Sequence, residues 1–414
     1  MTGFKIIYYF LFIITGLYGL YFSAVGIIGL LKKNKETEVL SDKQNRFAVL
    51  IAARNEEKTI GGLLKSLNMM RYPRDKFSVY VIPNNCTDQT EKIALENGAE
   101  VIRCTVPTKT KADVLRFAFS KLKANKEIDA YVVFDADNVV DSNFLYYMNR
   151  SLNSGFRVAQ GFREAKNPAD NWISGSYAIF YLFQNVFFNH TRRKMRLSAS
   201  INGTGFMIKK ELIDEVGFDT KTLTEDVEFS GLCALRNEKI DFVEDAITYD
   251  ENPVDFKSSW KQRKRWTAGN LSCMKLYSAK LFGHFIKTRN LSALDLSLRY
   301  SAPVVQVVGF ANFLLLSFFK VIGIELSDIF SRFFALGFLC MVISYFIGLI
   351  MEIIILKYKG KSVKPMVSGL LMFAFFVLTW VPINFVCLIK KQTSWEEIKH
   401  NRNISIAEIV KYYR

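Results

Sequence analysis

The sequence predicts an α/β domain with a mainly parallel sheet, joined to helices that cross a membrane. Between residues 46 and 135, short β-rich apolar runs alternate with amphipathic stretches, which is typical of βαβ units. Hydrophobic residues make up 50% of the chain and gather in long uncharged runs near its two ends. Because roughly 20 apolar residues suffice to cross a bilayer, we expect membrane spans on both sides of one Rossmann-like domain.

The first apolar run, Ile6 to Leu31, carries no charged residue and has no small-residue cleavage site of the kind that ends a signal peptide. We therefore expect an uncleaved N-terminal anchor. Three later runs cover residues 300–326, 333–356 and 366–389, and they predict further spans.

The charge and cysteine patterns argue against several other classes of protein. The net charge is +16, but Lys and Arg lie largely beside the apolar runs, as is typical of cytoplasmic loops that meet anionic lipid. We expect membrane lipid, and not nucleic acid, as a partner. The six Cys show no paired spacing, which argues against a disulfide-linked extracytoplasmic domain, and three His are too few to favour a His-built zinc site.

The elements of the domain can be predicted in order. Strands are expected at 46–53, 77–82, 99–104 and 131–134, with helices at 59–70, 89–97 and 111–124 between them. The second half is less regular: an aromatic-rich helical stretch at 172–190, a short strand at 206–208, a helix at 227–235 and an amphipathic segment from Trp260 that we expect to lie in the membrane interface.

The expected organisation has six parts. They are an N-terminal span (1–31), a linker (32–46), the α/β domain (47–256), amphipathic interface helices (257–297), transmembrane segments (298–389) and a basic tail (390–414).

Two acids, Asp135 and Asp137, follow the fourth predicted strand at spacing i, i+2. The carboxyl end of a strand is where an open α/β sheet binds its ligands. Carboxylates there can hold a hard divalent cation, which usually takes substrate phosphate oxygens as further ligands. A solvated turn is the alternative, since Asp-x-Asp is a common tripeptide. The pair favours metal-assisted use of a phosphate-bearing donor.

Further motifs follow along the chain. They are Ala53-Arg54-Asn55-Glu56, the turn from Asn84 to Asp88, Gly203-Thr204-Gly205, Thr224-Glu225-Asp226 and Gln262-x-x-Arg265-Trp266. Together with Asp135-Ala136-Asp137, their order and spacing resemble the membrane-bound processive family 2 glycosyltransferases with a GT-A fold. Cellulose, hyaluronan, chitin and poly-N-acetylglucosamine synthases belong to this group. The resemblance covers residues 45–270 and implies a nucleotide-sugar-binding domain.

The resemblance implies a role for each matching residue. Asp137 is the principal ligand of Mg²⁺ or Mn²⁺, with Asp135 beside it. Asp226 is the general base, positioned by Glu225 and Thr224, and its action inverts the anomeric carbon. The residues implied in binding a UDP-sugar donor are Ala53, Arg54, Glu56, Asn84, Lys111, Asp135, Gln262, Arg263 and Arg265, and those facing the acceptor are Trp266, Gly203, Thr204 and Gly205.

The chain departs from the family pattern at two positions. Asn84 stands where many relatives have an acid that accepts a hydrogen bond from uracil, so the identity of the base is open. Thr110, where relatives have Gly, precedes Lys111. The motif from Gln262 to Trp266 also has an alternative reading, since basic residues and an interfacial tryptophan can anchor a chain at a membrane surface.

The expected function is that of an inverting membrane glycosyltransferase, which polymerises a sugar from a UDP-sugar into a β-linked extracellular or capsular polysaccharide and exports it. The growing polysaccharide is then the acceptor, while oligomeric state and partner subunits stay open. One alternative is single-sugar transfer to a polyprenyl phosphate or lipid-linked acceptor, although such enzymes commonly lack the Gln-x-x-Arg-Trp motif. A transporter is a third possibility. Against it, the apolar runs lack the buried charges expected of an ion or substrate path, and Glu352 is the one acid well inside such a run.

The topology expected from this function places the catalytic domain in the cytoplasm, on a multi-pass protein of the cell membrane. Lys32, Lys33 and Lys35 after the first run agree with this placement. Three later crossings, however, put the basic tail outside. One resolution is that the run 366–389, which Pro382 interrupts, is re-entrant or lies along the interface.

Overall fold

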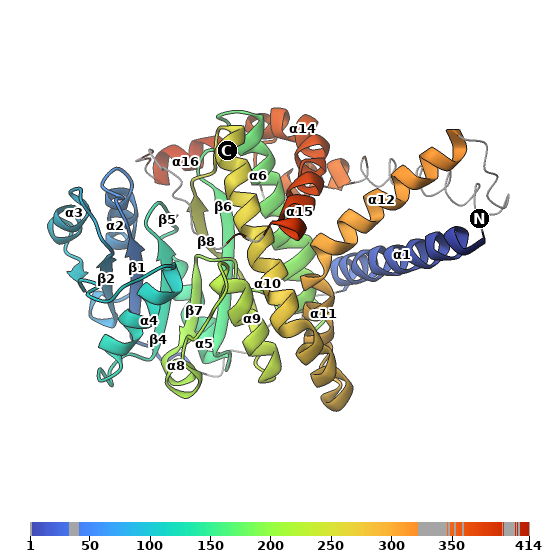
Figure 1. Ribbon diagram of the computed structural model, residues 1–414. Coiled ribbons are helices and arrows are strands. Elements are labelled where there is room, and N and C mark those ends of the chain that lie inside the picture. The colour runs from blue at the N-terminus through green and yellow to red at the C-terminus, as the bar shows by residue number, and fades with distance from the viewer. Residues whose placement is uncertain are drawn as a thin grey trace.

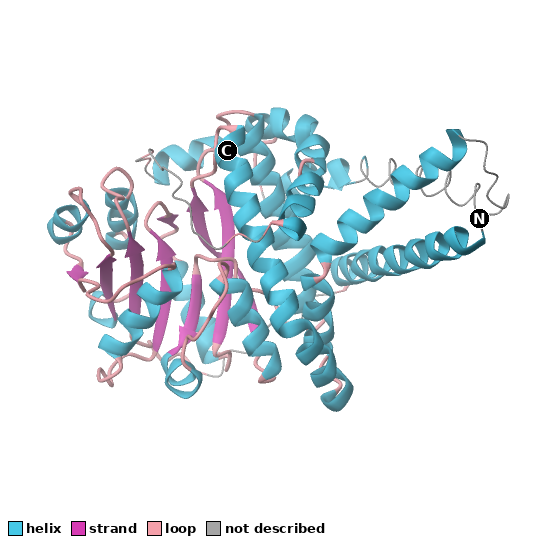
Figure 2. Ribbon diagram, viewed as in Figure 1, coloured by secondary structure: helices cyan, strands magenta, loops and turns pink. Residues whose placement is uncertain are grey.

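The computed structural model describes residues 2–32, 41–321, 360–390 and 406–413, together with 346, 348–351, 353–357, 392, 402 and 404. The predicted span 333–356 therefore lies mostly outside the described residues, and Glu352 is among the residues left out. Figure 2 shows a sheet flanked by helices, from which further helices project to one side.

The first half of the domain forms the predicted parallel sheet. Strand β1 pairs in parallel with β2 on one side and with β4 on the other, and β3 pairs in parallel with β2. The bounds are β1 Phe47–Ala53, α2 Ile60–Asn68, η1 Arg74–Lys76, β2 Phe77–Pro83, α3 Thr90–Glu96, β3 Glu100–Val101, α4 Lys111–Leu122 and β4 Ala130–Asp135. The order of strands and helices predicted from the sequence is confirmed here.

Strand β1 shows why these residues form a central strand. Leu50 packs with the residues of α4 on one face of the sheet, whereas Val49 and Ile51 pack with α2 on the other face. All three side chains are fully buried. A strand that is covered on both faces is apolar at every position, which is the pattern that predicted a parallel sheet.

The second half converts the sheet into a mixed one. Its eight strands run in the order β3-β2-β1-β4-β7-β6-β8-β5, and β7 is antiparallel to both β4 and β6. The bounds are β5 Val139–Val140, α5 Phe144–Asn153, β6 Val158–Ala165, α6 Trp172–Phe183, the π-helix η2 Gln184–His190, α7 Thr191–Lys194, β7 Phe206–Lys209, α8 Lys210–Val216, α9 Glu225–Leu235 and β8 Ile240–Asp250. The fold is a GT-A-like mixed α/β domain of Rossmann type, as expected.

Further helices complete the described part of the chain, and in Figure 1 α1, α10, α11, α12, α14 and α15 lie to one side of the sheet. The bounds are α1 Thr2–Leu31, α10 Phe256–Thr288, α11 Leu291–Tyr300, α12 Ala302–Val321, η3 Lys364–Met366, α14 Val367–Leu378, α15 Trp380–Ile389 and α16 Ile406–Tyr413. The amphipathic segment predicted from Trp260 is the middle of α10, and it packs against α9, α11 and α15.

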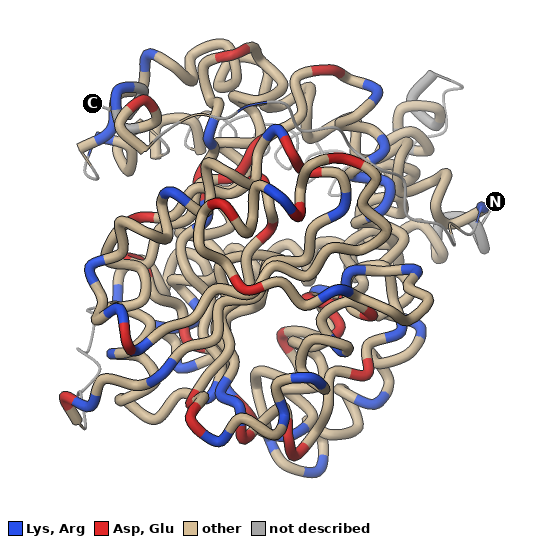
Figure 3. The backbone as a smooth tube through the Cα atoms, turned by 90° about the vertical axis from the view of Figure 1, so that its left-hand side faces the viewer, with Lys and Arg blue, Asp and Glu red and all other residues tan. Residues whose placement is uncertain are grey.

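Among the described residues, two helical stretches are long and apolar enough to cross a membrane, Ile6–Leu31 and Lys364–Ile389. A third is possible if α11 and the following Ala302–Leu315, which meet at 54°, count as one broken span. In Figure 1, α1 and α12 project away from the domain, whereas α14 and α15 lie against its body. In Figure 3, Lys, Arg, Asp and Glu are interspersed over the α/β domain, so this view shows no separate basic stripe.

Candidate active site

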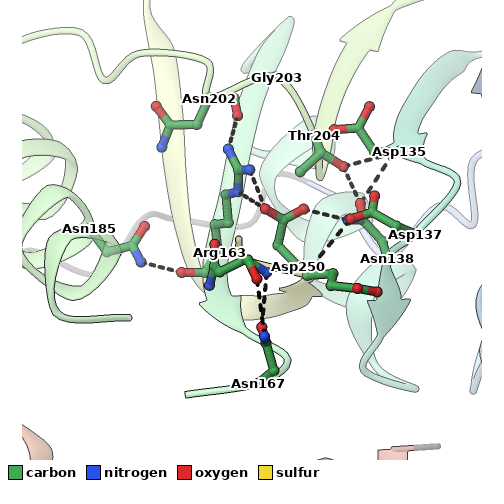
Figure 4. Close-up of polar contacts among 12 residues, drawn as sticks. Asp135, Asp137, Asn138, Arg163, Asn167, Asn185, Asn202, Gly203, Thr204 and Asp250 are labelled. Carbon is green, nitrogen blue, oxygen red and sulfur yellow. Dashed lines mark hydrogen bonds and ion pairs between the residues drawn. The ribbon is translucent and has the colours of Figure 1, made fainter. Parts of the chain in front are cut away.

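Three carboxylates meet at the carboxyl edge of the sheet (Figure 4). Asp135 ends β4, Asp137 follows it, and Asp250 ends β8. One oxygen from each lies within 4.8 Å of the others. The sequence analysis predicted the first two and missed Asp250. The missed signal was the same as for β4: the run Ile240 to Asp250 is a strand-like segment that ends in an acid.

Hydrogen bonds fix the orientation of Asp250. Asn138 donates from Nδ2 to its Oδ1 at 2.8 Å, and Arg163 donates from Nε to its Oδ2 at 3.1 Å. The same guanidinium donates from Nη1 to the carbonyl of Asn202 at 2.7 Å, and so connects the acid cluster to the loop before Gly203. Oxygen ligands held in this way fit the preference of Mg²⁺ or Mn²⁺ for hard donors.

Lys111 lies between the acid cluster and the glycine loop. It begins α4, which a capping box of Thr110 and Asp113 starts. Its ammonium pairs with Asp135 and donates to the carbonyl of Gly203 at 2.8 Å. Burial alone would raise the pKa of Asp135, but the adjacent Lys111 charge holds that pKa below its usual value. Asp135 is therefore ionised at neutral pH.

The N-terminus of α9 brings two further acids to the site. Thr224 caps this helix, and Glu225 and Asp226 form its first turn. Burial and then the neighbouring Asp226 carboxylate raise the pKa of Glu225 to about 7, and burial raises the pKa of Asp226. An Asp226 oxygen lies 3.4 Å from where a Cβ on Gly203 would stand, and Gly203 has a φ of +83°. A side chain at residue 203 would be strained by this positive φ, and its Cβ would lie in van der Waals contact with Asp226.

One cavity of about 810 Å³ connects these groups. The predicted site residues that line it are Ala53, Arg54, Glu56, Asn84, Lys111, Asp135, Asp137, Gly203, Thr224, Glu225, Asp226, Gln262, Arg265 and Trp266. Within the described part of the chain, several residues that line it have a buried polar atom without a hydrogen-bond partner, among them Thr224 Oγ1, Gln262 Oε1 and Arg265 Nε. Buried polar atoms are normally paired, so these atoms indicate a place for a polar ligand.

Three predicted site residues do not line the cavity. The Arg263 guanidinium donates to the carbonyl of Phe376 at 3.0 Å and to Thr379 Oγ1, and it therefore ties α10 to α14. Thr204 Oγ1 bonds to Asn138 and accepts from the backbone N–H of Asp135, while the Gly205 carbonyl accepts from the N–H of Gly161. Their contacts are internal because α10 and the glycine loop each turn only one face to the cavity.

Trp266 lines the cavity as part of an aromatic cluster. Ring centroids of Tyr177, Phe180 and Trp380 lie 6.0, 6.3 and 6.5 Å from its own. This aromatic cluster joins α6, α10 and α15. It gives the cavity an apolar wall of the kind on which a sugar ring can stack. Asn84, which also lines the cavity, accepts a hydrogen bond from Thr108 through Oδ1 at 2.7 Å.

The close packing of α10 on Thr224 makes a testable prediction. A Cβ on Gly269 would lie 2.3 Å from Thr224 Oγ1, so Gly269→Ala must displace the N-terminus of α9. We expect a stability loss of about 1–3 kcal/mol in thermal unfolding and a fall in activity. Gly283→Ala, on the same helix with no atom within 4 Å of the new Cβ, is the matched control, and it should be neutral or stabilising. Equal effects of the two variants would contradict the role of this contact.

Comparison with known proteins identifies the family. The model of the glycosyltransferase-like family 2 matches residues 44–269, more than half of the chain. The chain belongs to this family.

Relatives of this family 2 glycosyltransferase have different activities. A probable glycosyltransferase of Bacillus subtilis, YdaM, is 28% identical over 57% of this chain and 58% of its own length. A β-monoglucosyldiacylglycerol synthase of Nostoc is 25% identical (54% of this chain, 48% of its own), and the poly-β-1,6-N-acetyl-D-glucosamine synthase of Staphylococcus aureus is 24% identical (57% of each). The matched part thus spans about half of the length of these relatives. Neither relative's product is therefore assigned to this chain by the comparison alone.

A solved structure supports the fold of the family 2 glycosyltransferase. The mannosyltransferase PcManGT from Pyrobaculum calidifontis, in complex with GDP-Man and Mn²⁺, superposes with a TM-score of 0.59. The match covers 90% of this chain and 99% of that one at 17% identity. This likeness supports the fold, and the family model shows membership of the glycosyltransferase-like family 2.

Proposed function

We propose that the protein is an inverting, metal-dependent membrane glycosyltransferase that takes a sugar from UDP and adds it to a growing β-linked polysaccharide. The observation that carries the proposal is the single cavity, because the acid cluster, Asp226 and Trp266 all line it. Donor and acceptor can therefore meet in one site.

The donor diphosphate is assigned to the acid-cluster end. Asp137, Asp135 and Asp250 would hold Mg²⁺ or Mn²⁺, which neutralises charge on the departing diphosphate when bound. Lys111 and Arg265 line the same cavity and supply positive charge toward phosphate oxygens. Ala53, Arg54, Glu56 and Asn84 line the part next to β1 and β2, and we assign the nucleoside to them.

Asp226 is assigned as the general base. Its carboxylate removes the proton from an acceptor hydroxyl while that oxygen bonds to the anomeric carbon from the side opposite the diphosphate. Inversion follows from this direction of attack. Thr224 and Glu225 hold the first turn of α9, so that Asp226 faces the cavity next to Gly203.

The acceptor is assigned to the aromatic end. Trp266 offers an apolar face to a sugar ring, and the cavity continues from it to Ala302, Pro303 and Gln306 of α12. A chain that lengthens by one sugar per turnover must leave the site, and this end points to the apolar helices. The similarity to a poly-N-acetylglucosamine synthase supports polymerisation.

We further propose a multi-pass topology in the cell membrane with the catalytic domain in the cytoplasm. Helices α1 and α12 project from the domain and expose large apolar side chains, among them Leu17, Leu20 and Leu314. Helices α14 and α15 combine both features, since they pack on α6 and α10 and also expose large apolar side chains such as Leu371 and Ile389.

Single-sugar transfer to a lipid is the second candidate function. The cavity also reaches Tyr18 and Phe22 of α1, which would suit a lipid chain, and one relative makes a glycolipid. Gel filtration of the labelled product distinguishes the two functions, since a polymer elutes far ahead of a single glycolipid.

The pair of acids on α9 predicts the pH dependence of transfer. A raised pKa keeps a carboxyl group protonated to higher pH, and a protonated base cannot accept a proton. The pKa of Asp226, the proposed base, is raised by burial, as is that of its neighbour Glu225, so the transfer rate should rise with pH through a pKa above that of an ordinary aspartate. In Glu225→Gln the Asp226 carboxylate loses a negatively charged neighbour, so the rise of the rate with pH should move to lower pH. Initial rates of UDP release measure it, with the exposed Glu211→Gln as control; an unmoved rise would contradict the assignment.

A further inference from the structure

Two arginines and one aspartate meet where α1, η2, α7 and α11 pack together. Arg192 donates to both oxygens of Asp295, from Nε at 3.2 Å and from Nη2 at 3.1 Å. Tyr21 of α1 adds a third hydrogen bond to the same carboxylate at 2.9 Å. Arg192 and Asp295 are 1% and 3% exposed. The carboxylate is therefore fully committed to Arg192 and Tyr21.

Arg299 lies one helical turn after Asp295, and among the described residues it makes no hydrogen bond to that carboxylate. Among the described residues, its buried Nη1 has no hydrogen-bond partner. The guanidinium carbon lies 4.3 Å from the ring centroid of Phe188, whose ring also carries Arg192 at 3.7 Å. Asp295 and Asp226 act on Arg299 through space without a hydrogen bond to it, so this cluster of two arginines and one aspartate leaves one positive charge without a bonded counterion.

This charge faces the cavity. Arg299 lines it, and so do several residues of neighbouring helices. They are Tyr18 and Phe22 of α1, Phe188 of η2, and Pro303 and Gln306 of α12. The wall around the cation is thus mainly aromatic and apolar. A ligand that satisfies both features combines one anionic group with an apolar chain.

We propose that this end of the cavity binds the phosphate of a membrane lipid through Arg299, with the lipid chain between α1 and α12. Phosphate is the anion that a bilayer presents at headgroup depth, and the planar guanidinium fork matches its oxygens. The residue proposed here differs from Lys111 and Arg265, to which we assign the donor diphosphate. The inference does not rest on polymerisation, because it concerns a lipid phosphate whether that lipid is a resident molecule or the acceptor.

The test compares two lipids that differ only in phosphate. Purified full chain in dodecyl maltoside is equilibrated with radiolabelled dioleoyl phosphatidate or dioleoylglycerol. We expect phosphatidate to bind at least about tenfold more tightly, as one charge-assisted contact implies. Arg299→Gln should lose about tenfold in phosphatidate affinity, and Arg299→Lys should lose less. Arg236→Gln, at an exposed arginine after α9, should bind as the wild type does.

Binding of UDP with Mn²⁺, measured in parallel, separates this inference from the proposed function, because it should be unchanged in all three variants. Equal binding of the two lipids by the wild type would overturn the inference without any variant. So would wild-type phosphatidate affinity in Arg299→Gln. A polyprenyl phosphate added with labelled donor then distinguishes the sources: label on the polyprenyl lipid supports an acceptor phosphate, and label in polymer alone, with phosphatidate bound, supports a resident lipid.

Discussion

Asp226→Asn should abolish most sugar transfer while leaving donor binding intact. The amide has the size of the carboxylate but cannot take a proton from the acceptor hydroxyl, so we expect the rate to fall by about 10²–10⁴-fold. The residues that we assign to the donor lie in or just after β1, β2 and β4 and in α4 and α10, and the substitution does not alter them. Single-turnover transfer and calorimetric titration with UDP and Mn²⁺ measure the two properties separately.

The matched control for this variant is Asp219→Asn, at an exposed carboxylate shortly before α9. It should retain wild-type activity. If Asp226→Asn keeps more than roughly a tenth of the wild-type rate, well above the range for loss of a general base, the base must be another group, and Glu225 is the nearest candidate.

Asp137→Asn should reduce transfer and donor affinity together. Its carboxylate is 4% exposed and lies with Asp135 and Asp250 in the acid cluster. Losing one of three charged oxygen ligands weakens the hold on Mn²⁺, and with it the stabilisation of the leaving diphosphate. We expect a loss of about 10²–10³-fold in rate, comparable to removing one strong electrostatic stabiliser. Mn²⁺ binding followed by electron paramagnetic resonance should fall in parallel, and chelation by EDTA should inactivate the wild type reversibly.

Asp245→Asn provides the control for the acid cluster, since Asp245 is exposed on the same strand as Asp250. It should leave both Mn²⁺ affinity and rate unchanged. Full activity of Asp137→Asn, or of the wild type in excess EDTA, would contradict a metal-dependent mechanism.

The parallel half of the fold was predictable because each strand there is buried on both faces. Runs such as Val49 to Ile51 are then apolar without interruption. The mixed half was harder to predict. β7 has only four residues and lies antiparallel between β4 and β6, and no local pattern states this pairing. The π-helix η2 likewise depends on the packing of its aromatic residues against α1 and α7.

The site was predictable where the residues of a motif are so close in sequence that they must lie close together in space. Asp135 and Asp137 share a strand end, and the α9 acids share one helical turn, so spacing alone brings each pair together. Asp250 and Arg163 reach the cluster from β8 and β6, and only the strand order places them there. Arg263, which was expected to help hold the donor diphosphate, does not line the cavity, because two arginines two positions apart on a helix point to different faces.

The measurement that tests the central claim most directly is a donor screen. Purified full chain with Mn²⁺ is supplied with each radiolabelled UDP-sugar in turn, and released UDP and labelled product are quantified together. The account predicts that one UDP-sugar yields UDP and β-linked product of polymer size, and that Asp226→Asn yields neither. Absence of UDP release from every UDP-sugar, or label confined to a single-sugar lipid, would contradict it.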